Sequence, residues 1–269
     1  MTTPDQTPLY DWDGADLYTP QQPAAGPWSQ GVLHGGAVSA LLAGLVEHPE
    51  QVLTRVLVEL LGPVPSTPLR AVVEPAEGGR RVIRQTVVLH AGDRPVARAL
   101  ALRMRRDDLD LPEKATDNPV AFDPAEAPPL TERNEHAAKT VGWESFDSIA
   151  MAAHWDRSPL VPGVRRRMWM RLLVPVVPGR PASAIENVAA AADYGTSGTN
   201  ARLDFQKWTF MNADLVINLS RPPADGWIGL ECDGYLSRTG TGQSVATVHD
   251  REGVLGQSSQ SILLESRQR

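Results

Sequence analysis

The sequence contains a single cysteine, Cys232, among 269 residues. No disulfide can form within the chain, and such low cysteine use is typical of a reducing compartment. We expect Cys232 to be a core residue rather than a nucleophile. Long hydrophobic runs are missing as well, so no membrane span is expected, and the N-terminal residues are unlike a signal peptide. Together these absences predict a cytoplasmic protein that does not interact with a membrane.

An excess of positive charge is also absent, since 26 Lys and Arg face 32 Asp and Glu for a net charge of −6. This balance argues against nucleic-acid binding. The six histidines have no paired metal-ligand spacing, so neither a metal nor another cofactor is expected. The sequence lacks both a Gly-x-Ser-x-Gly elbow and a phosphate-binding glycine loop, which argues against a serine hydrolase and a nucleotide-dependent enzyme.

The strongest feature present is an apolar stretch at residues 36–47, in which only Ser39 and Glu47 are polar. A helix that is apolar on every side has to be buried. At about 1.5 Å per residue it would be roughly 18 Å long, which is too short to cross a bilayer. The stretch follows His34-Gly35-Gly36, whose glycines allow close backbone approach and whose free N–H groups can polarise a carbonyl.

Strand-like runs separated by turns and prolines fill most of the remaining chain. In the first half they cover residues 53–61, 69–74, 81–90 and 95–105. In the second half they cover residues 146–155, 167–176, 213–221, 227–236, 243–250 and 254–265, with a second apolar helix at 182–193. The proline-rich and charged residues between the halves cannot build a core. We therefore expect an N-terminal domain at 1–107, a linker at 108–143 and a C-terminal domain at 144–269.

Shifting the sequence by 159 residues superposes the two sets of strands, with Pro63 on Pro222 and His90 on His249. No gap is needed between residues 53 and 104. Identical pairs are few, but both halves share the order helix, strand, proline break and three further strands. The pattern predicts two copies of one unit, a helix wrapped by an antiparallel sheet.

The two copies differ at polar positions. Asn212 aligns with Leu53, Gln260 aligns with Ala101, and Asp193 ends the second helix. The helix register is less certain, because the loop after the second helix is longer, and it places Asp193 near Leu42 or Ala43. Only the first copy has His34-Gly35-Gly36. A single composite site, with backbone donors from one half and polar side chains from the other, would explain both asymmetries.

On these residues the chain resembles the TesB-like acyl-CoA thioesterases. Gly26-Pro27-Trp28 and His34-Gly35-Gly36-Ala37 are similar to the N-terminal half of that family, and Asn212-Ala213-Asp214 and the segment 221–227 are similar to its C-terminal half. The resemblance implies an α+β double hotdog, two tandem repeats that each have a long central helix wrapped by a curved antiparallel sheet. The family uses Asp, Thr and Gln as its catalytic trio. Asp193 matches the first, Asn212 stands at the Thr position, and Gln260 lies one residue earlier than the family pattern.

The resemblance implies hydrolysis of acyl-CoA thioesters. In this hypothesis Asp193 is the base or nucleophile, Asn212 and Gln260 orient water, and the amides of Gly35 and Gly36 polarise the thioester carbonyl. His34 would fix the loop or the acyl-CoA. The expected partners are the acyl-CoA substrate and further copies of the chain, as a homodimer or larger assembly.

A second hypothesis remains open, that of a hotdog protein that binds acyl-CoA or another acyl ligand without catalysis. Under this alternative, Asp193 belongs to a helix C-terminal turn. Asn212 and Gln260 then serve only to satisfy buried backbone groups. The two hypotheses differ in whether the three side chains converge near Gly36.

Overall fold

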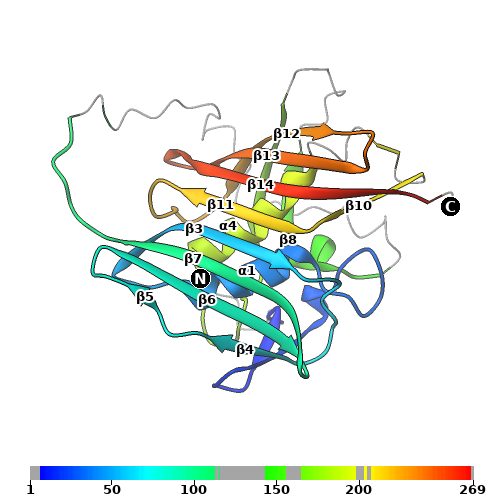
Figure 1. The fold of residues 1–269 in the computed structure, drawn as a ribbon, viewed down its shortest axis with the longest axis horizontal. Coiled ribbons are helices and arrows are strands. Elements are labelled where there is room, and N and C mark those ends of the chain that lie inside the picture. The colour runs from blue at the N-terminus through cyan, green and yellow to red at the C-terminus, as the bar shows by residue number, and fades with distance from the viewer. Residues whose placement is uncertain are drawn as a thin grey trace.

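The computed structural model describes residues 7–112, 115, 143–155, 165–197, 203–204 and 207–267. Most of the expected linker, including Asp123–Pro129, lies outside the described residues. Two α-helices pack against each other beside one antiparallel sheet, and Figure 1 shows the strands of both halves running across these helices. Within the described residues, no helix is both long and apolar enough to cross a membrane.

The first half contains the following elements in order: β1 (Tyr10–Trp12), β2 (Leu17–Pro20), the 3-10 turn η1 (Gln22–Ala24), α1 (Gly35–Val46), β3 (Gln51–Leu60), β4 (Leu69–Val73), β5 (Glu77–Gly78), β6 (Val82–Ala91) and β7 (Arg94–Arg105). The second half contains the π-helical turn η3 (Phe146–Ala150), β8 (Met151–Trp155), β9 (Arg166–Leu172), α4 (Ala184–Ala192), the 3-10 turn η4 (Asp193–Thr196), β10 (Trp208–Asn212), β11 (Asp214–Leu219), β12 (Ile228–Leu236), β13 (Thr241–Asp250) and β14 (Gly253–Ser266).

Both predicted helices are present and both are buried. Leu41 and Leu42 of α1 belong to the same core cluster as Val188 of α4, so the two halves share one core. The helices approach closely at Gly44, where an added Cβ would stand only 2.2 Å from an oxygen of Glu186. An almost entirely apolar α1 is stable here because α4 and the sheet remove it from water.

The pairing of the strands follows the shift of 159 residues. Val58 of β3 lies opposite Ala99 of β7, and their equivalents Ile217 and Ser258 lie opposite each other in β11 and β14. The same shift relates β6–β7 to β13–β14 and β4–β6 to β12–β13. Even the irregularity after Leu89 in the β6–β7 pair recurs at the shifted position, between β13 and β14.

The two halves join through β3 and β11, which pair antiparallel at the middle of the sheet. At the centre of this pair Leu57 lies opposite its own equivalent, Val216. The pairing of β3 with β7 is irregular at Thr54, and the equivalent residue Ala213 separates β10 from β11. The pair β10 and β11 therefore corresponds to the single strand β3, and the sheet has a pseudo-two-fold arrangement about Leu57 and Val216.

Three sequence-based assignments were wrong in detail. Residues 146–150 form η3 rather than the start of a strand, and the Ser148 hydroxyl closes this turn by accepting from the Ser145 N–H at 2.8 Å and donating to the Ser145 carbonyl at 3.0 Å. The strand expected over 167–176 ends at Leu172, shortly before Pro175, which cannot donate a ladder hydrogen bond. β10 was not predicted as a separate strand.

Candidate active site

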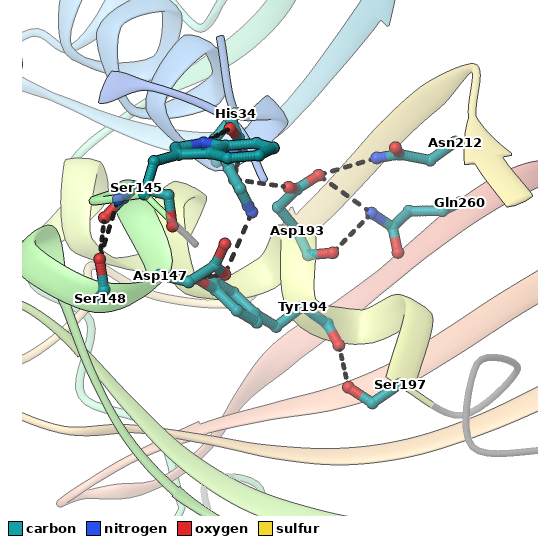
Figure 2. Close-up of polar contacts among 12 residues, drawn as sticks. His34, Ser145, Asp147, Ser148, Asp193, Tyr194, Ser197, Asn212 and Gln260 are labelled. Carbon is teal, nitrogen blue, oxygen red and sulfur yellow. Dashed lines mark hydrogen bonds and ion pairs between the residues drawn. The ribbon is translucent and has the colours of Figure 1, made fainter. Parts of the chain in front are cut away.

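The start of α1 and the end of α4 meet at one polar cluster, which Figure 2 shows in close-up. His34 is the N-cap of α1, and Asp193 follows the last residue of α4. Asn212 and Gln260 reach the same place from β10 and β14. The structure thus brings together the side chains that the sequence analysis assigned to a composite site, and they come from both halves of the chain.

Asp193 is the centre of this cluster. Asn212 Nδ2 donates to its Oδ1 at 2.7 Å, and Gln260 Nε2 lies 3.3 Å from the same oxygen and 3.1 Å from the Asp193 carbonyl. The carboxylate is buried, with 8% of the residue exposed. Burial raises the pKa of Asp193, and His34, Asn212 and the Gly36 N–H only partly offset this effect. A carboxylate with a raised pKa is a stronger base at neutral pH.

Gly35 and Gly36 are required because there is no room for a side chain at either position, not because of their backbone conformation. An added Cβ at Gly35 would stand 2.9 Å from both carboxylate oxygens of Asp193. At Gly36 it would stand 2.9 Å from the Ala190 carbonyl and from a ring carbon of Phe146. A side chain at Gly35 would displace the Asp193 carboxylate, and one at Gly36 would push the backbone of α4 away from the start of α1.

The Gly36 N–H is already engaged, because it donates to His34 Nδ1 at 3.0 Å. The same nitrogen of His34 lies 3.3 Å from Asp193 Oδ2. This bond caps the first turn of α1 and fixes the imidazole beside the carboxylate. The amide of Gly36 can therefore turn to a substrate carbonyl only by giving up this contact.

Asp147, in η3, is a member of the cluster that the sequence analysis missed. His34 Nε2 lies 3.4 Å from Asp147 Oδ1, and the Tyr194 hydroxyl donates to the same oxygen at 2.6 Å. The His34 ring stacks with both Phe146 and Tyr194, at centroid distances of 4.6 and 5.4 Å, and these two rings also stack with each other at 6.5 Å. The sequence analysis assigned Asp147 to a strand-like run at residues 146–155, so its only signal as a site residue was a carboxylate shortly after the linker.

Backbone contacts hold η3 against the first half of the chain. Phe146 N–H donates to the Ala25 carbonyl at 2.8 Å, and Gln22 Nε2 donates to the Glu144 carbonyl at 2.6 Å. Gln22 and Ala25 lie just before the loop that carries His34. Asp147 is therefore fixed on the side of His34 opposite Asp193.

The charges of the cluster are coupled. Burial opposes protonation of His34, but the carboxylates of Asp147 and Asp193 outweigh it, and the pKa of His34 is raised. Burial also acts to raise the pKa of Asp147, but His34 and the Tyr194 hydroxyl outweigh it and the pKa is lowered. The shifts therefore favour an ionised Asp147 and strengthen proton binding at both His34 and Asp193.

Other nucleophiles and metal ligands do not gather elsewhere in the described ranges. No group of His, Cys, Asp and Glu among these residues is arranged to hold a metal ion. Cys232 is buried in the core, as predicted, and burial raises the pKa of its thiol to about 12. A thiol in this state is a poor nucleophile at neutral pH.

Two protein-family models match the chain. One describes the acyl-CoA thioesterase C-terminal domain and matches residues 112–264, which is more than half of the chain, and the other describes the acyl-CoA thioesterase N-terminal domain and matches residues 24–104. No curated protein sequence matches significantly.

Solved structures match over almost the whole chain. A tesB protein from Mycobacterium avium subspecies paratuberculosis has 17% identity and a TM-score of 0.66, with 95% of each chain covered. The acyl-CoA thioesterase II TesB2 from Mycobacterium marinum has 15% identity and a TM-score of 0.64, with 96% of each chain covered. A protein with the hotdog fold from Alicyclobacillus acidocaldarius has 15% identity and a TM-score of 0.65, with 95% of each chain covered. The chain therefore has the hotdog fold, and by its family matches it belongs to the acyl-CoA thioesterase family and is a thioesterase.

Proposed function

We propose that this protein hydrolyses acyl-CoA to a free fatty acid and CoA with Asp193 as the general base. The observation that carries the proposal is the Asp193 carboxylate itself, which is buried at the end of α4, faces the start of α1 and accepts bonds from two side-chain amides. An ionised carboxylate in this setting can remove a proton from a water molecule that adds to the acyl carbon.

Asn212 and Gln260 serve to orient the reacting groups, because neither amide can take up a proton. Both donate to Asp193 Oδ1, which leaves Oδ2 as the oxygen that takes the proton. Gln260 Oε1 is buried and has no hydrogen-bond partner in the described part of the chain. A buried acceptor of this kind favours a bound water or substrate group as its partner.

The start of α1 supplies the polarising dipole for the thioester carbonyl. The Gly35 N–H lies in the first turn of the helix, where backbone donors have no partner within the helix. A carbonyl held there would have the Asp193 carboxylate close by, since no side chain separates Gly35 from it. The Gly36 N–H, held by His34 Nδ1, contributes only if that contact opens. Addition of water, breakage of the C–S bond and protonation of the CoA sulfur then complete the reaction.

The same architecture gives each half a defined part. The shift of 159 residues between strand pairs supports a double hotdog with an N-terminal unit at 1–107, a linker at 108–143 and a C-terminal unit at 144–269. The equivalent second site has Leu53 and Ala101 in place of Asn212 and Gln260, so it has no groups to hold a water. The active site is thus a composite of both units and occurs once per chain.

Release of free CoA thiol from a panel of short, medium and long acyl-CoAs tests the proposal, with wild type beside Asp193→Asn. Removal of a general base typically costs about 10²–10⁴-fold in rate, and we expect a loss of this order for every chain length that is hydrolysed. Asp93→Asn, at an exposed turn between β6 and β7, is the matched control and should retain wild-type turnover.

The other outcomes separate the alternatives. Turnover that survives Asp193→Asn would leave the enzyme but refute the assigned base. Saturable binding of acyl-CoA by folded wild-type protein, without turnover at any chain length, would support the non-catalytic hotdog instead. Single-turnover hydrolysis in ¹⁸O-labelled water distinguishes Asp193 as base from Asp193 as nucleophile. A base delivers the labelled oxygen to the fatty acid, whereas an acyl–Asp193 anhydride that water opens at the Asp193 carbon leaves the label in the Asp193 carboxylate.

A further inference from the structure

We propose that Asp147 is a positioning residue for this reaction and that it acts through His34, which relays the proton that Asp193 removes from water. This inference rests on the proposed function of Asp193. It extends the site to a fourth side chain from the second half, and it gives His34 a role other than holding the loop or the substrate.

The hydrogen-bond pattern of His34 defines which of its nitrogens is free to accept a proton. Nδ1 accepts the Gly36 N–H at 3.0 Å, so this nitrogen carries no proton and its lone pair becomes free when that contact opens. Nε2 faces Asp147 Oδ1 at 3.4 Å, which places the imidazole proton on that side. A carboxylate beyond one nitrogen of an imidazole fixes its tautomer and orientation. Asp147 thus keeps Nδ1 unprotonated and directed at Asp193 in the resting site.

The distance between His34 Nδ1 and Asp193 Oδ2 is 3.3 Å, so a proton on either atom can be shared between them. Asp193 takes one proton from the attacking water, whose oxygen forms the new bond to the acyl carbon. The Gly36 N–H leaves Nδ1 as the proton moves from Oδ2 to the Nδ1 lone pair, and the C–S bond breaks with its electron pair on sulfur. The imidazolium returns the proton to the CoA thiolate, which leaves as the thiol, and both side chains are restored.

The surroundings of His34 suit a transient positive charge. The imidazolium would stand between the carboxylates of Asp147 and Asp193, at 3.4 and 3.3 Å. The aromatic rings of Phe146 and Tyr194 stack with it at centroid distances of 4.6 and 5.4 Å, and cations are attracted to the π-electrons of such rings. Among the described residues, the Tyr194 hydroxyl is a further titratable group at the pair, and it donates to Asp147.

A double-mutant cycle on kcat tests whether Asp147 works through His34. Asn at position 34 keeps a side-chain acceptor for the Gly36 N–H, since Asn is a favoured N-cap, but it cannot relay a proton. We expect Asp147→Asn and His34→Asn each to lower kcat by about 10–100-fold. The double variant should be no slower than His34→Asn alone, because residues that act as one unit are not additive. Losses that multiply would overturn the inference.

The pH profile gives a readout that a merely structural role would not move. His34 must be neutral to accept a proton, and its pKa is raised. We therefore expect kcat to decrease as the pH is lowered, with a midpoint above the ordinary imidazole pKa of 6.5. Asp147→Asn removes an anion that favours the imidazolium, so the midpoint should move to lower pH. A rate loss in Asp147→Asn with an unmoved midpoint would contradict the relay.

Two further measurements keep the test decisive. If Asp147→Asn does not fold, ¹⁵N NMR of labelled histidine in wild-type protein, assigned by difference with His34→Asn, should show Nε2 protonated, Nδ1 as acceptor and a pKa above 6.5. A protonated Nδ1 in the neutral ring would overturn the inference. Activity of Asp193→Asn separates the two proposals. Turnover in that variant refutes the proposed function, whereas its loss beside a wild-type-like Asp147→Asn refutes only the relay.

Discussion

Gly35, the first residue of α1, lies against the carboxylate of Asp193 so closely that an added Cβ would stand 2.9 Å from both oxygens. The end of one half's helix and the start of the other's therefore meet with no side chain between them. This contact puts backbone donors beside the proposed base. It also makes the position of Asp193 sensitive to the smallest possible addition.

Gly35→Ala should therefore lower kcat with little change in stability. The added methyl displaces the Asp193 carboxylate, and a shift of about 1 Å can cost about 100-fold in rate. Alanine is a better helix former than glycine by about 1 kcal/mol, which offsets part of the strain. The measurements are kcat with the best acyl-CoA and the free energy of unfolding in denaturant.

Gly79→Ala is the matched control, since an added Cβ there meets nothing within 4 Å. It should leave kcat unchanged. Wild-type turnover in Gly35→Ala would show that the Asp193 carboxylate is not held where the chemistry requires it.

Asn212→Leu should shift the acid limb of the kcat/KM profile to higher pH. Leucine is the residue at the equivalent position of the first half, Leu53. The substitution removes the amide that donates to Asp193 Oδ1 at 2.7 Å. A hydrogen bond to a charged group is worth about 1.5–3 kcal/mol, which corresponds to about one to two pH units. Because this bond favours the ionised carboxylate, its loss raises the pKa of Asp193, and the base is ionised only at higher pH.

Asn212→Thr is the companion variant, because a hydroxyl at this position can still donate to the carboxylate. Its acid limb should lie closer to that of wild type. Identical pH profiles for wild type and Asn212→Leu would mean that Asn212 does not stabilise the ionised form of Asp193.

The repeat made most of the sheet predictable. Strand pairing in an antiparallel sheet allows few registers once apolar faces and turns are set, so the shift found in the sequence also holds for Val58 with Ala99 and for Ile217 with Ser258. The convergence of Asn212 and Gln260 on Asp193 followed from the same shift. These residues are polar where Leu53 and Ala101 face the core.

Asp147 was not predictable in this way. It lies in η3, next to the linker, where no period relates it to the first half. Its position depends on long-range backbone contacts such as that of Phe146 N–H with the Ala25 carbonyl. Contacts of this kind, between loops far apart in sequence, leave no local signal in either segment.

Asp250→Asn should destabilise the fold by about 3 kcal/mol at neutral pH, as expected when a buried ion pair loses one charge. Arg221 forms a bidentate pair with this fully buried carboxylate, with bonds of 2.6 and 2.7 Å. The N–H groups of Ala224 and Glu252 also donate to it. Burial acts to raise the pKa of Asp250, but these donors outweigh it and the pKa is lowered.

The sign of the pH dependence follows from that lowered pKa. The ionised Asp250 stabilises the folded state fully above its ordinary pKa of 3.8, and this contribution is lost as the pH falls through the lower folded value. Denaturant unfolding between pH 3 and 7 measures the free energy of unfolding of wild type and Asp250→Asn. The difference between the two proteins should be constant near neutral pH and should become smaller at the acid end. Asp16→Asn, which breaks the exposed pair with Arg70, should change stability by less than about 1 kcal/mol at any pH. A difference in the free energy of unfolding between wild type and Asp250→Asn that becomes larger on acidification would contradict this account.

Gly44→Ala should destabilise the packing of α1 on α4, although alanine favours helices. An added Cβ would stand 2.2 Å from Glu186 Oε1, and Glu186 is held by Arg180 and by the Ser183 N–H at 2.7 Å. Moving the carboxylate breaks these contacts, and overpacking of this kind costs about 1–3 kcal/mol. In a Glu186→Ala background the obstructing atoms are gone, so Gly44→Ala should stabilise the fold instead. The gain is the better helix propensity of alanine, up to about 1 kcal/mol. Free energies of unfolding for the four proteins of this cycle measure the coupling. The same destabilisation by Gly44→Ala in both backgrounds would show that the two helices do not meet at this point.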